Sequence, residues 1–508
     1  MKKYKLISIG LGLLCATICL SQPYAIPGAL GLAKNVRGAY AGSSSPTVII
    51  VDRLTDDSGN NGSNKGSFRW CLTRSYPRII LFEVSGYINL TSYIRVTSDY
   101  VSIYGQTAPS PGITVSGIDV VDFRCDNVVM QHIRFRSAYA GSSQIDALSL
   151  YDADNVFVDH CSFSYAKDES VGISGSSDDM SGVITFQNCI FSNPLAGQDG
   201  KGLLAGNNVL SASVLRSAFI HCGIRSPYPN GSSYTKWENV NTIAYNPAYW
   251  GQELSGGNNP EFNIIGNVWK AGPNTSGQRQ VVRFRSSLSS GAKAYLYNNY
   301  SPKRVGGSEW NGVAVFQDSR DSSNYKVDSP FSWGETNYYS YKVLEDSLVA
   351  NAGARPWNRD SVDIIALNDM VNGTGKWITY QSEAYYPKLA ENKITLDIPV
   401  SPHADSGNGY TNLEMWVYGM ANKVYTANHI LKSSSDCFIY PNPTTDYLIF
   451  NGRPDSGIKI INSSGQVISQ NDIVENRTRI DISTCKPGMY FVVFRKNGNI
   501  DSRKFIKI

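Results

Sequence analysis

The 508-residue sequence has almost no excess of charge of either sign. Its 46 basic and 42 acidic residues give a formal net charge of +4, which falls to about +1 when Lys2, Lys3 and Lys5 of an N-terminal segment are set aside. A surface that binds nucleic acid needs a strong basic excess, so that class of partner is excluded. Affinity for a polyanion would have to come from a local patch.

Cysteine is scarce and gives no sign of a disulfide framework. Of nine cysteines, seven remain when Cys15 and Cys19 of the N-terminal segment are set aside. That number is odd, the spacing is not dense, and no pair has the spacing of zinc ligands. We therefore expect free thiols in a core, with Cys437 and Cys485 as the one pair that could be an exception.

Blocks rich in alanine, leucine and glutamate, which form helices, are also scarce until late in the chain. Glycine (45 residues) and tyrosine (31 residues) are abundant instead, which favours an all-β fold. A length of 508 residues exceeds one ordinary compact core. Several domains or an elongated repeat architecture are therefore expected.

The N-terminus has the pattern of a secretory signal. Three lysines precede an apolar run over residues 6–20, which is too short to span a bilayer. We predict a signal peptide over residues 1–21 and export of the mature chain.

An internal repeat organises the middle of the chain. Residues 128–136, 156–164 and 184–192 superpose at steps of 28 residues, and further copies begin at Leu215, Val240, Ile265 and Leu296. This spacing is typical of a solenoid in which each turn carries its own loop. His160, Asn188, Ser217, Thr242 and Asn267 are predicted to share one register and to form an internal hydrogen-bonded ladder.

A second set of strands aligns through charged residues. The same three-residue pattern, charged, then small, then apolar, begins at Asp146, Glu169 and Lys201. Asp168 immediately precedes Glu169. Neighbouring strands lie about 4.8 Å apart, so these charges should line one edge, with Arg225 one turn further. Converging carboxylates need a cation or a base between them, and such oxygen clusters suit Ca²⁺. A surface row of salt bridges would explain the same spacing.

The chain also resembles the pectate lyase family of polysaccharide lyases over residues 26–420. The blocks that carry the resemblance occur in order: "IPGALGLA", "GSFRWCL", "VSGYINL", "IYGQTAPSPGI", "NVVMQHIRFR", "DALSLYDADNVFVDHCSFSYAKDES", "HCGIRSP", "NAGARPWNRDSVDIIALNDMVNGTG" and "GYTNLEMWVYGM". The resemblance implies a right-handed parallel β-helix over residues 22–430, whose last part, from about residue 330, is a wrap of helices and loops.

Position by position, the resemblance places Asp146 and Asp168 at calcium-ligand positions, with Glu169 adjacent, and we predict all three as metal ligands. Lys201 matches the lysine that binds substrate, and Arg225 matches the arginine that removes a proton and also contacts substrate. The sequence departs from the family at three positions. Gln144 and Gly172 stand where many members have acidic ligands, and Asn230 replaces a second arginine. A calcium site with fewer protein ligands is therefore expected.

The reaction that the resemblance implies is calcium-assisted β-elimination from a polyuronate such as pectate. The C5 proton is removed, the C4 glycosidic oxygen leaves, and an unsaturated sugar end remains. Two alternatives stay open: a lyase for methyl-esterified pectin and a β-helix that binds glycans without catalysis. A galacturonan hydrolase is disfavoured because none of the five histidines has the Gly-His-Gly setting of that family.

The C-terminal 436–508 region reads as a small β-sandwich after a serine-rich joint. It resembles the sorting domain of type IX secretion, with Pro441, Asn442, Pro443 and the Gly488-Met489-Tyr490 stretch as matching points. A carbohydrate-binding module of this size is the alternative. The resemblance implies partnership with the type IX machinery, passage through the periplasm and outer membrane, and a secreted or cell-surface location. We also expect a monomer, and one helix around residues 359–371 that packs near one end of the coil.

Overall fold

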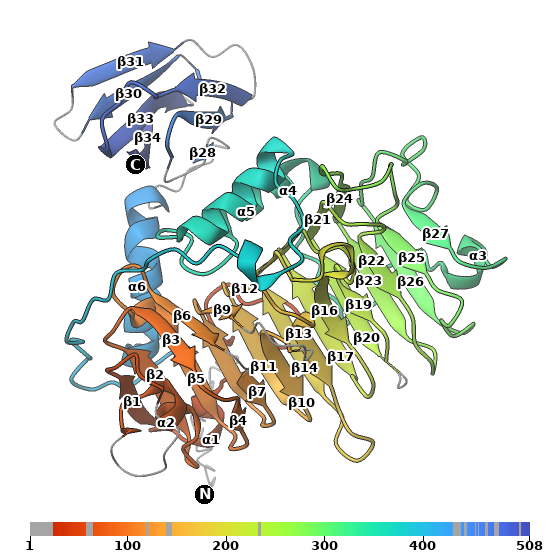
Figure 1. Ribbon diagram of the computed structural model, residues 1–508, viewed down its shortest axis with the longest axis horizontal. Helices are drawn as coiled ribbons and strands as arrows, with labels where there is room; N and C mark the ends of the chain where they lie inside the picture. The colour runs from red at the N-terminus through yellow and green to blue at the C-terminus, as the bar shows by residue number, and fades with distance from the viewer. Residues whose placement is uncertain are drawn as a thin grey trace, which may run out of the picture.

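The computed structural model describes residues 24–56, 64–117, 121–138, 145–231, 235–429, 438–440, 444–452, 454–455, 457–462, 466–471, 477–496 and 499–507. The predicted signal peptide, Gln144, Cys437 and residues 441–443 lie outside these ranges. An elongated coil of parallel strands forms the body of the molecule, as Figure 1 shows. Across the described ranges, no helix is long and apolar enough to cross a membrane.

Three parallel sheets run along the coil, and a short fourth sheet joins them late. The first contains β1 (Thr47–Val51), β2 (Arg78–Phe82), β5 (Val101–Tyr104), β8 (Val128–Gln131), β11 (Asp154–Asp159), β14 (Gly182–Gln187), β17 (Ser211–Leu215), β20 (Lys236–Val240), β23 (Glu261–Ile265) and β26 (Lys293–Tyr297). The second contains β4 (Ile94–Val96), β7 (Val121–Phe123), β10 (Leu148–Tyr151), β13 (Glu169–Ser174), β16 (Lys201–Ala205) and β19 (Tyr228–Pro229). The third contains β3 (Gly86–Leu90), β6 (Ile113–Gly117), β9 (Arg134–Ser137), β12 (Ser162–Ser164), β15 (Ile190–Ser192), β18 (Ala218–Ile220), β21 (Ile243–Tyr245) and β24 (Val268–Lys270). The fourth contains β22 (Gln252–Leu254), β25 (Val282–Phe284) and β27 (Ala314–Phe316).

Helices are few in the part of the chain that the structure describes. They are α1 (Ala39–Gly42), α2 (Phe68–Leu72), α3 (Ser322–Tyr325), α4 (Tyr341–Asn351), α5 (Ser361–Asn372) and α6 (Asn412–His429), with 3₁₀ turns η2 (Gly105–Thr107), η3 (Gly197–Asp199) and η4 (Gln381–Glu383). The predicted parallel β-helix is therefore confirmed.

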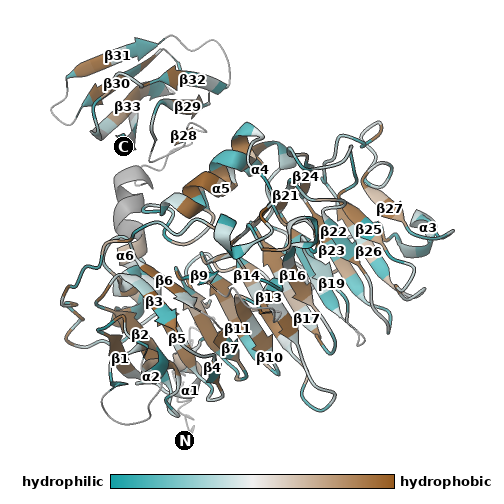
Figure 2. Ribbon diagram, in the orientation of Figure 1, coloured by the Kyte–Doolittle hydropathy of each residue, from teal (hydrophilic) through white to brown (hydrophobic). Residues whose placement is uncertain are grey.

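The repeat of the sequence becomes a stack of side chains inside the coil. Phe135, Phe163, Phe191 and Phe219 occupy equivalent positions, and the ring centroids of successive pairs are 5.6, 5.3 and 4.6 Å apart. Figure 2 shows the hydrophobic residues concentrated on the strands of the coil. The coil cysteines that the structure describes are buried free thiols, as the sequence predicted. The same apolar position thus fills the core on every turn.

The predicted polar ladder is only partly correct. The backbone N–H of Thr242 donates to Asn267 Oδ1 at 2.8 Å, so these two residues do form an internal ladder. His160 and Asn188 do not belong to it, because Asp159 pairs with Gln187, and Gln187 pairs in turn with Leu215. Both residues therefore align with Arg216, one position before Ser217, at a corner of the coil.

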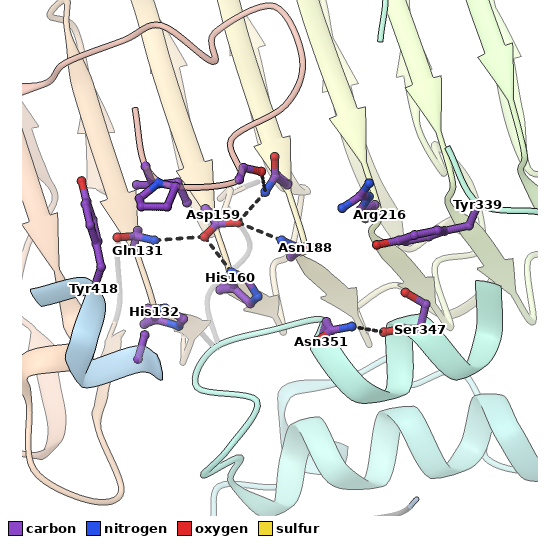
Figure 3. Close-up of a pocket in the computed structure, with 15 residues that line it drawn as sticks. Gln131, His132, Asp159, His160, Asn188, Arg216, Tyr339, Ser347, Asn351 and Tyr418 are labelled. Atoms are coloured by element: carbon purple, nitrogen blue, oxygen red, sulfur yellow. Dashed lines mark hydrogen bonds and ion pairs between the residues drawn. The ribbon is translucent and has the colours of Figure 1, made fainter. Parts of the chain in front are cut away.

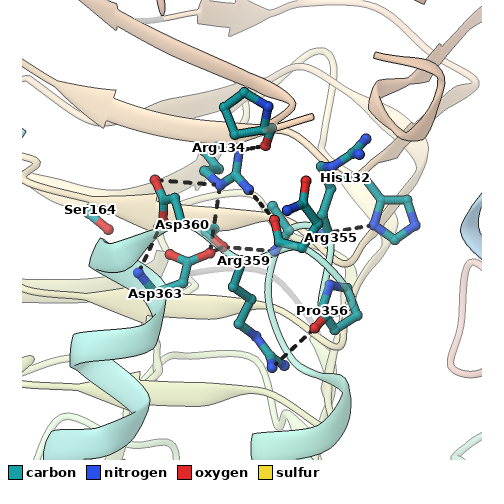
Figure 4. A network of polar contacts seen from close by, with 12 residues as sticks. His132, Arg134, Ser164, Arg355, Pro356, Arg359, Asp360 and Asp363 are labelled. Carbon is teal, nitrogen blue, oxygen red and sulfur yellow. Dashed lines mark hydrogen bonds and ion pairs between the residues drawn. The ribbon is translucent and has the colours of Figure 1, made fainter. Parts of the chain in front are cut away.

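The helix predicted around residues 359–371 is present as α5, but it lies along the side of the coil. Together with α4 it buries apolar side chains against β15, β18 and β21. Figure 4 shows the polar contacts that hold its N-terminus. Arg136 of β9 contacts Asp360 and donates to Asp363 Oδ1 at 2.9 Å, and Ser162 Oγ donates to Asp363 Oδ2 at 2.6 Å. These long-range ion pairs place the helix on the third sheet and not at an end.

Replacing Asp360 with asparagine should destabilise the protein strongly. Burial would raise the pKa of Asp360, but the charges of Arg136 and Arg134 outweigh it and hold that pKa at about 2. Without Asp360, the buried charges of Arg136 and Arg134 are offset only by Asp363, and such an excess of buried charge costs about 3 to 5 kcal/mol. The ordinary pKa of an aspartate is about 4, so the stabilisation is present above about pH 4 and is lost as the pH falls toward 2.

Thermal unfolding of the wild type and Asp360→Asn at pH 7 and at pH 3 tests this expectation. The difference between the two proteins should be smaller at the lower pH. Asp328→Asn is the control, because the Asp328 side chain is 87% exposed in its pair with Lys326. Equal loss of stability in both variants would contradict the role given to the buried pair.

The C-terminal region forms two antiparallel sheets that enclose their own core. One contains β28 (Phe438–Tyr440), β29 (Tyr447–Asn451) and β32 (Arg477–Asp481), and the other contains β30 (Ile458–Asn462), β31 (Val467–Asn471), β33 (Gly488–Lys496) and β34 (Asn499–Lys507). Side chains from both sheets, including Phe450, Ile460 and Phe494, form one apolar cluster. This is the predicted β-sandwich. Cys485 is a free thiol within it.

Candidate active site

The five candidate residues lie on neighbouring turns of the second sheet. Glu169 pairs directly with Lys201, and the pairing of β10 with β13 sets Asp146 level with Glu169. The predicted register is therefore correct. Arg225 lies on the next turn, immediately after Ile224, which forms a bridge with Lys201, and its backbone is left-handed with φ of +60°. An uncommon backbone conformation for arginine thus occurs at the edge of this row.

Three carboxylates, which we call the acid cluster, converge at this edge. One ligand oxygen from each of Asp146, Asp168 and Glu169 lies within 4.8 Å of the others. Asp146 is fixed by two hydrogen bonds: Ser149 Oγ donates to its Oδ2 at 2.8 Å, and the backbone N–H of Glu169 donates to its Oδ1 at 3.0 Å. Residues of β10 and β13 therefore hold the Asp146 carboxylate in place.

Two basic side chains form ion pairs with carboxylates of the acid cluster and offset their negative charge. Lys201 Nζ contacts Asp168 Oδ1, and Arg225 Nη1 contacts Glu169 Oε1. The side chains of Lys201 and Arg225 are 21% and 25% exposed, whereas that of Glu169 is only 6% exposed. The two bases therefore lie nearer to solvent than Glu169 does, where a substrate could reach them.

Burial and neighbouring charges in the site shift the pKa values of Asp146 and Arg225. Burial raises the pKa of Asp146 to about 7, and the charge of Asp168 adds to the rise, while the hydrogen bond from Ser149 opposes it. Burial also lowers the pKa of the Arg225 guanidinium, although the charge of Asp168 opposes this shift. Both shifts have the same origin, because burial disfavours the charged form of each group.

The departures from the family pattern differ in how they affect the site. A Cβ atom on Gly172 would overlap Asp146 Oδ2, so no side chain fits there unless Asp146 moves. Gly172 therefore makes room for the observed position of that carboxylate. Asn230 lies just after β19, where its backbone N–H donates to Ala205 O at 2.7 Å. Gln144 lies outside the residues that the structure describes.

A further group of residues, which sequence reasoning missed, continues the site from β19 of the second sheet to the fourth sheet. We call it the arginine–aromatic row: Tyr228, Trp250, Glu253, Arg283 and Arg285. Glu253 accepts hydrogen bonds from Arg283 and Arg285 at 2.8 and 3.0 Å. The guanidinium of Arg283 lies 4.0 Å from the Trp250 ring centroid, and those of Arg285 and Arg225 lie 5.5 and 5.9 Å from the centroid of Tyr228. The alternation of Arg283 and Arg285 around buried Phe284 was the available sequence signal.

Comparison with known proteins identifies the relatives of the chain. Probable pectate lyase C of Aspergillus fumigatus is 32% identical over 346 residues, which cover 67% of this chain and 75% of the relative. Probable pectate lyase C of Aspergillus flavus is 29% identical over 422 residues, covering 79% and 95%. The solved structure of pectate lyase II from Xanthomonas campestris is 14% identical, with a TM-score of 0.42, and covers 66% of this chain and 100% of that one.

These relatives make the chain a polysaccharide lyase and favour an enzyme over a β-helix that only binds glycans. It belongs to the pectate lyase family. Residues 438–508 match a second family, described as a secretion system C-terminal sorting domain. That match confirms the predicted sorting domain, indicates export by type IX secretion, and removes the alternative of a carbohydrate-binding module.

Proposed function

We propose that the chain cleaves pectate by calcium-assisted β-elimination. The acid cluster is the metal site, Lys201 binds the substrate through its positive charge, and Arg225 accepts the proton. The observation that carries the proposal is the convergence of three carboxylates within 4.8 Å of one another beside two basic side chains. Methyl-esterified pectin fits this arrangement less well, because it lacks the carboxylate charges that calcium would bridge.

The residues present fit a calcium ion. All three groups of the acid cluster offer hard carboxylate oxygens, which Ca²⁺ prefers. Burial and mutual repulsion make the unbridged Asp146 carboxylate costly to ionise, and its pKa of about 7 expresses that cost. Asp146, Asp168 and Glu169 would hold the ion. When bound, calcium supplies positive charge that neutralises carboxylates of enzyme and substrate and stabilises negative charge that develops during reaction.

The reaction needs a base for a weakly acidic C5–H bond. In this proposal Arg225 takes the C5 proton, the electron pair of that bond forms the C4–C5 double bond, and the C4–O bond breaks so that the pair leaves with the glycosidic oxygen. Guanidinium is normally charged. Its burial, which lowers the pKa of Arg225, favours the neutral form that can accept a proton. Lys201 contributes a positive charge to the uronate carboxylate as negative charge develops there.

The arginine–aromatic row would bind further sugar units of the polymer. Pectate presents a carboxylate on each unit, and arginine binds carboxylates through a planar fork of donors. Arg283 and Arg285 are 18% and 34% exposed, and both lie beyond Arg225 along the coil. Trp250 and Tyr228 add aromatic faces to the same row. We therefore assign the row to substrate binding and not to the chemical step.

The partners follow from the same proposal. The substrate is an acidic polysaccharide, the type IX machinery exports the chain across the outer membrane, and the enzyme acts outside the cell or at its surface. The domain limits at residues 21, 430 and 436 and the monomeric state remain predictions.

Substrate comparison tests the proposal. Ultraviolet absorbance of unsaturated product should rise with polygalacturonate and calcium, and it should stay flat when a chelator is present. Methyl-esterified pectin should give a much lower rate at the same polymer concentration. Faster turnover of the esterified polymer, unaffected by the chelator, would favour a pectin lyase instead.

A further inference from the structure

A cavity lies at a corner of the coil that is not part of the candidate active site. It has a volume of about 390 Å³ and lies between the ends of β8, β11 and β14, the N-terminal segment near Pro27, and helices α4 and α6. Figure 3 shows it with the side chains that line it. Small-molecule sites have volumes of about 300 to 1,000 Å³, so the cavity suits a small ligand and not a polymer chain.

Four equivalent residues of successive turns line the cavity. His132, His160, Asn188 and Arg216 occur at steps of 28 residues and all have left-handed backbones, with φ of +58°, +50°, +53° and +48°. Such conformations are unfavourable for residues other than glycine, and asparagine and histidine tolerate them better than arginine does. The coil thus places four polar side chains in one row at this corner.

A buried carboxylate organises the centre of the cavity. Asp159 is 1% exposed and accepts hydrogen bonds from Gln131 Nε2, Asn188 Nδ2 and Gln187 Nε2 at 3.0, 3.0 and 3.3 Å. His160 Nδ1 lies 2.6 Å from Asp159 Oδ2, the oxygen that also accepts from Gln131, whereas Asn188 and Gln187 donate to Oδ1. The carboxylate fixes the imidazole so that Nδ1 carries the shared proton, and the other nitrogen, Nε2, remains for a ligand.

Arg216 supplies the positive charge of the cavity. Its guanidinium lies over the Tyr339 ring, 4.3 Å from the centroid, and Nη2 reaches Asn337 O only at 3.4 Å. Within the part of the chain that the structure describes, Arg216 Nε is buried and has no hydrogen-bond partner. A buried donor without an acceptor is unfavourable. Nε is out of reach of a ligand, so a ligand would bind at the terminal nitrogens of the guanidinium, and a carboxylate suits that fork best.

The donor pattern disfavours a metal ion here. Asp159 is already occupied by four donors, and His132 Nδ1 accepts from the backbone N–H of Arg355 at 3.3 Å. Its remaining nitrogen therefore carries the proton of the neutral ring and cannot ligate a metal. Among the described residues, the only grouping of three potential metal ligands is the acid cluster. The cavity instead offers a cation, an imidazole and amides, which suit a carboxylate and hydroxyl groups.

We propose that this cavity binds a small hydroxylated carboxylate of the size of one sugar acid, with its carboxylate on Arg216 and its hydroxyl groups on His160 and Asn188. The proposal does not depend on the assignment of the active site, because the cavity shares no residue with it. Binding here leaves the chemistry at Arg225 untouched.

Isothermal titration calorimetry with D-galacturonate, in the presence of a chelator, tests the proposal. The wild type should bind one equivalent in this cavity, distinct from any uronate bound at the arginine–aromatic row, and Arg216→Gln should bind it about 10- to 100-fold more weakly, as expected for loss of a charge-assisted hydrogen bond. Lys201→Gln, in the candidate active site, is the matched control and should bind as the wild type does. D-galactose, which lacks the carboxylate, should bind as weakly to the wild type as galacturonate does to Arg216→Gln.

Turnover of polygalacturonate by Arg216→Gln should equal that of the wild type. If Arg216→Gln does not fold, Arg216→Lys keeps the charge without the planar fork and should show a smaller, several-fold loss of affinity. Three results would overturn the proposal: no binding to the wild type, equal affinity for galactose, or binding lost in Lys201→Gln and kept in Arg216→Gln. The last result would assign the ligand to the active site.

Discussion

Arg225→Lys is expected to lower kcat by about 10² to 10⁴-fold while KM changes only a few-fold. Lysine keeps a positive charge near the substrate, so binding of the polyuronate should persist. The planar guanidinium and its placement are lost, and with them the group that takes the C5 proton. Initial rates of unsaturated product against polygalacturonate concentration, with calcium in excess, give both constants.

Arg285→Lys is the matched control for this experiment. Arg285 lies near the same Tyr228 ring as Arg225, with distances of 5.5 and 5.9 Å to its centroid. Because we assign Arg285 to substrate binding, its variant should raise KM and leave kcat nearly unchanged. Near wild-type kcat in Arg225→Lys would rule out Arg225 as the base.

Lys201 separates binding from chemistry in a different way. Its ammonium would contact the substrate carboxylate both before and during reaction, so Lys201→Ala should raise KM and lower kcat together. The three basic residues thus give three distinguishable kinetic patterns.

The register of the active-site strands could be predicted from the sequence. Asp146, Glu169 and Lys201 each begin a charged, small, apolar pattern, and the observed pairing of Glu169 with Lys201 follows it. The pattern worked because strands of a coil repeat the same inward and outward positions on every turn. The reason for glycine at position 172 could not be predicted, because only the structure shows that Asp146 lies too close for a side chain there.

The corner of the coil could not be predicted in the same way. His160 was aligned with Ser217, although the observed pairing sets it beside Asn188 and Arg216. A polar residue occurs at both positions, and polarity alone does not distinguish a side chain inside the coil from one at a left-handed corner. The resulting error of one residue hid the cavity around Asp159.

The position of α5 on the coil could not be predicted from the sequence either. Its helical pattern was clear, but its place depends on contacts between Arg136 and the Asp360–Asp363 pair, which lie more than 200 residues apart in the chain. Ion pairs of such separation leave no local pattern. The arginine–aromatic row was missed because most of its residues lie on or beside the fourth sheet, which only joins the coil after β19.

The calcium concentration that gives half-maximal turnover tests the central claim most directly, because it asks whether the acid cluster holds the metal. Asp146→Ala and Asp168→Ala each remove one hard oxygen ligand, so we expect each to raise this concentration about 10-fold or more. Asp122→Ala is the matched control, since Asp122 lies on the neighbouring strand β7, level with Ser149, and pairs with Arg124 instead. It should leave the calcium requirement unchanged, and far-ultraviolet circular dichroism should show that all three variants are folded. If both cluster variants kept the wild-type calcium requirement, the assignment of the acid cluster as the metal site would be wrong.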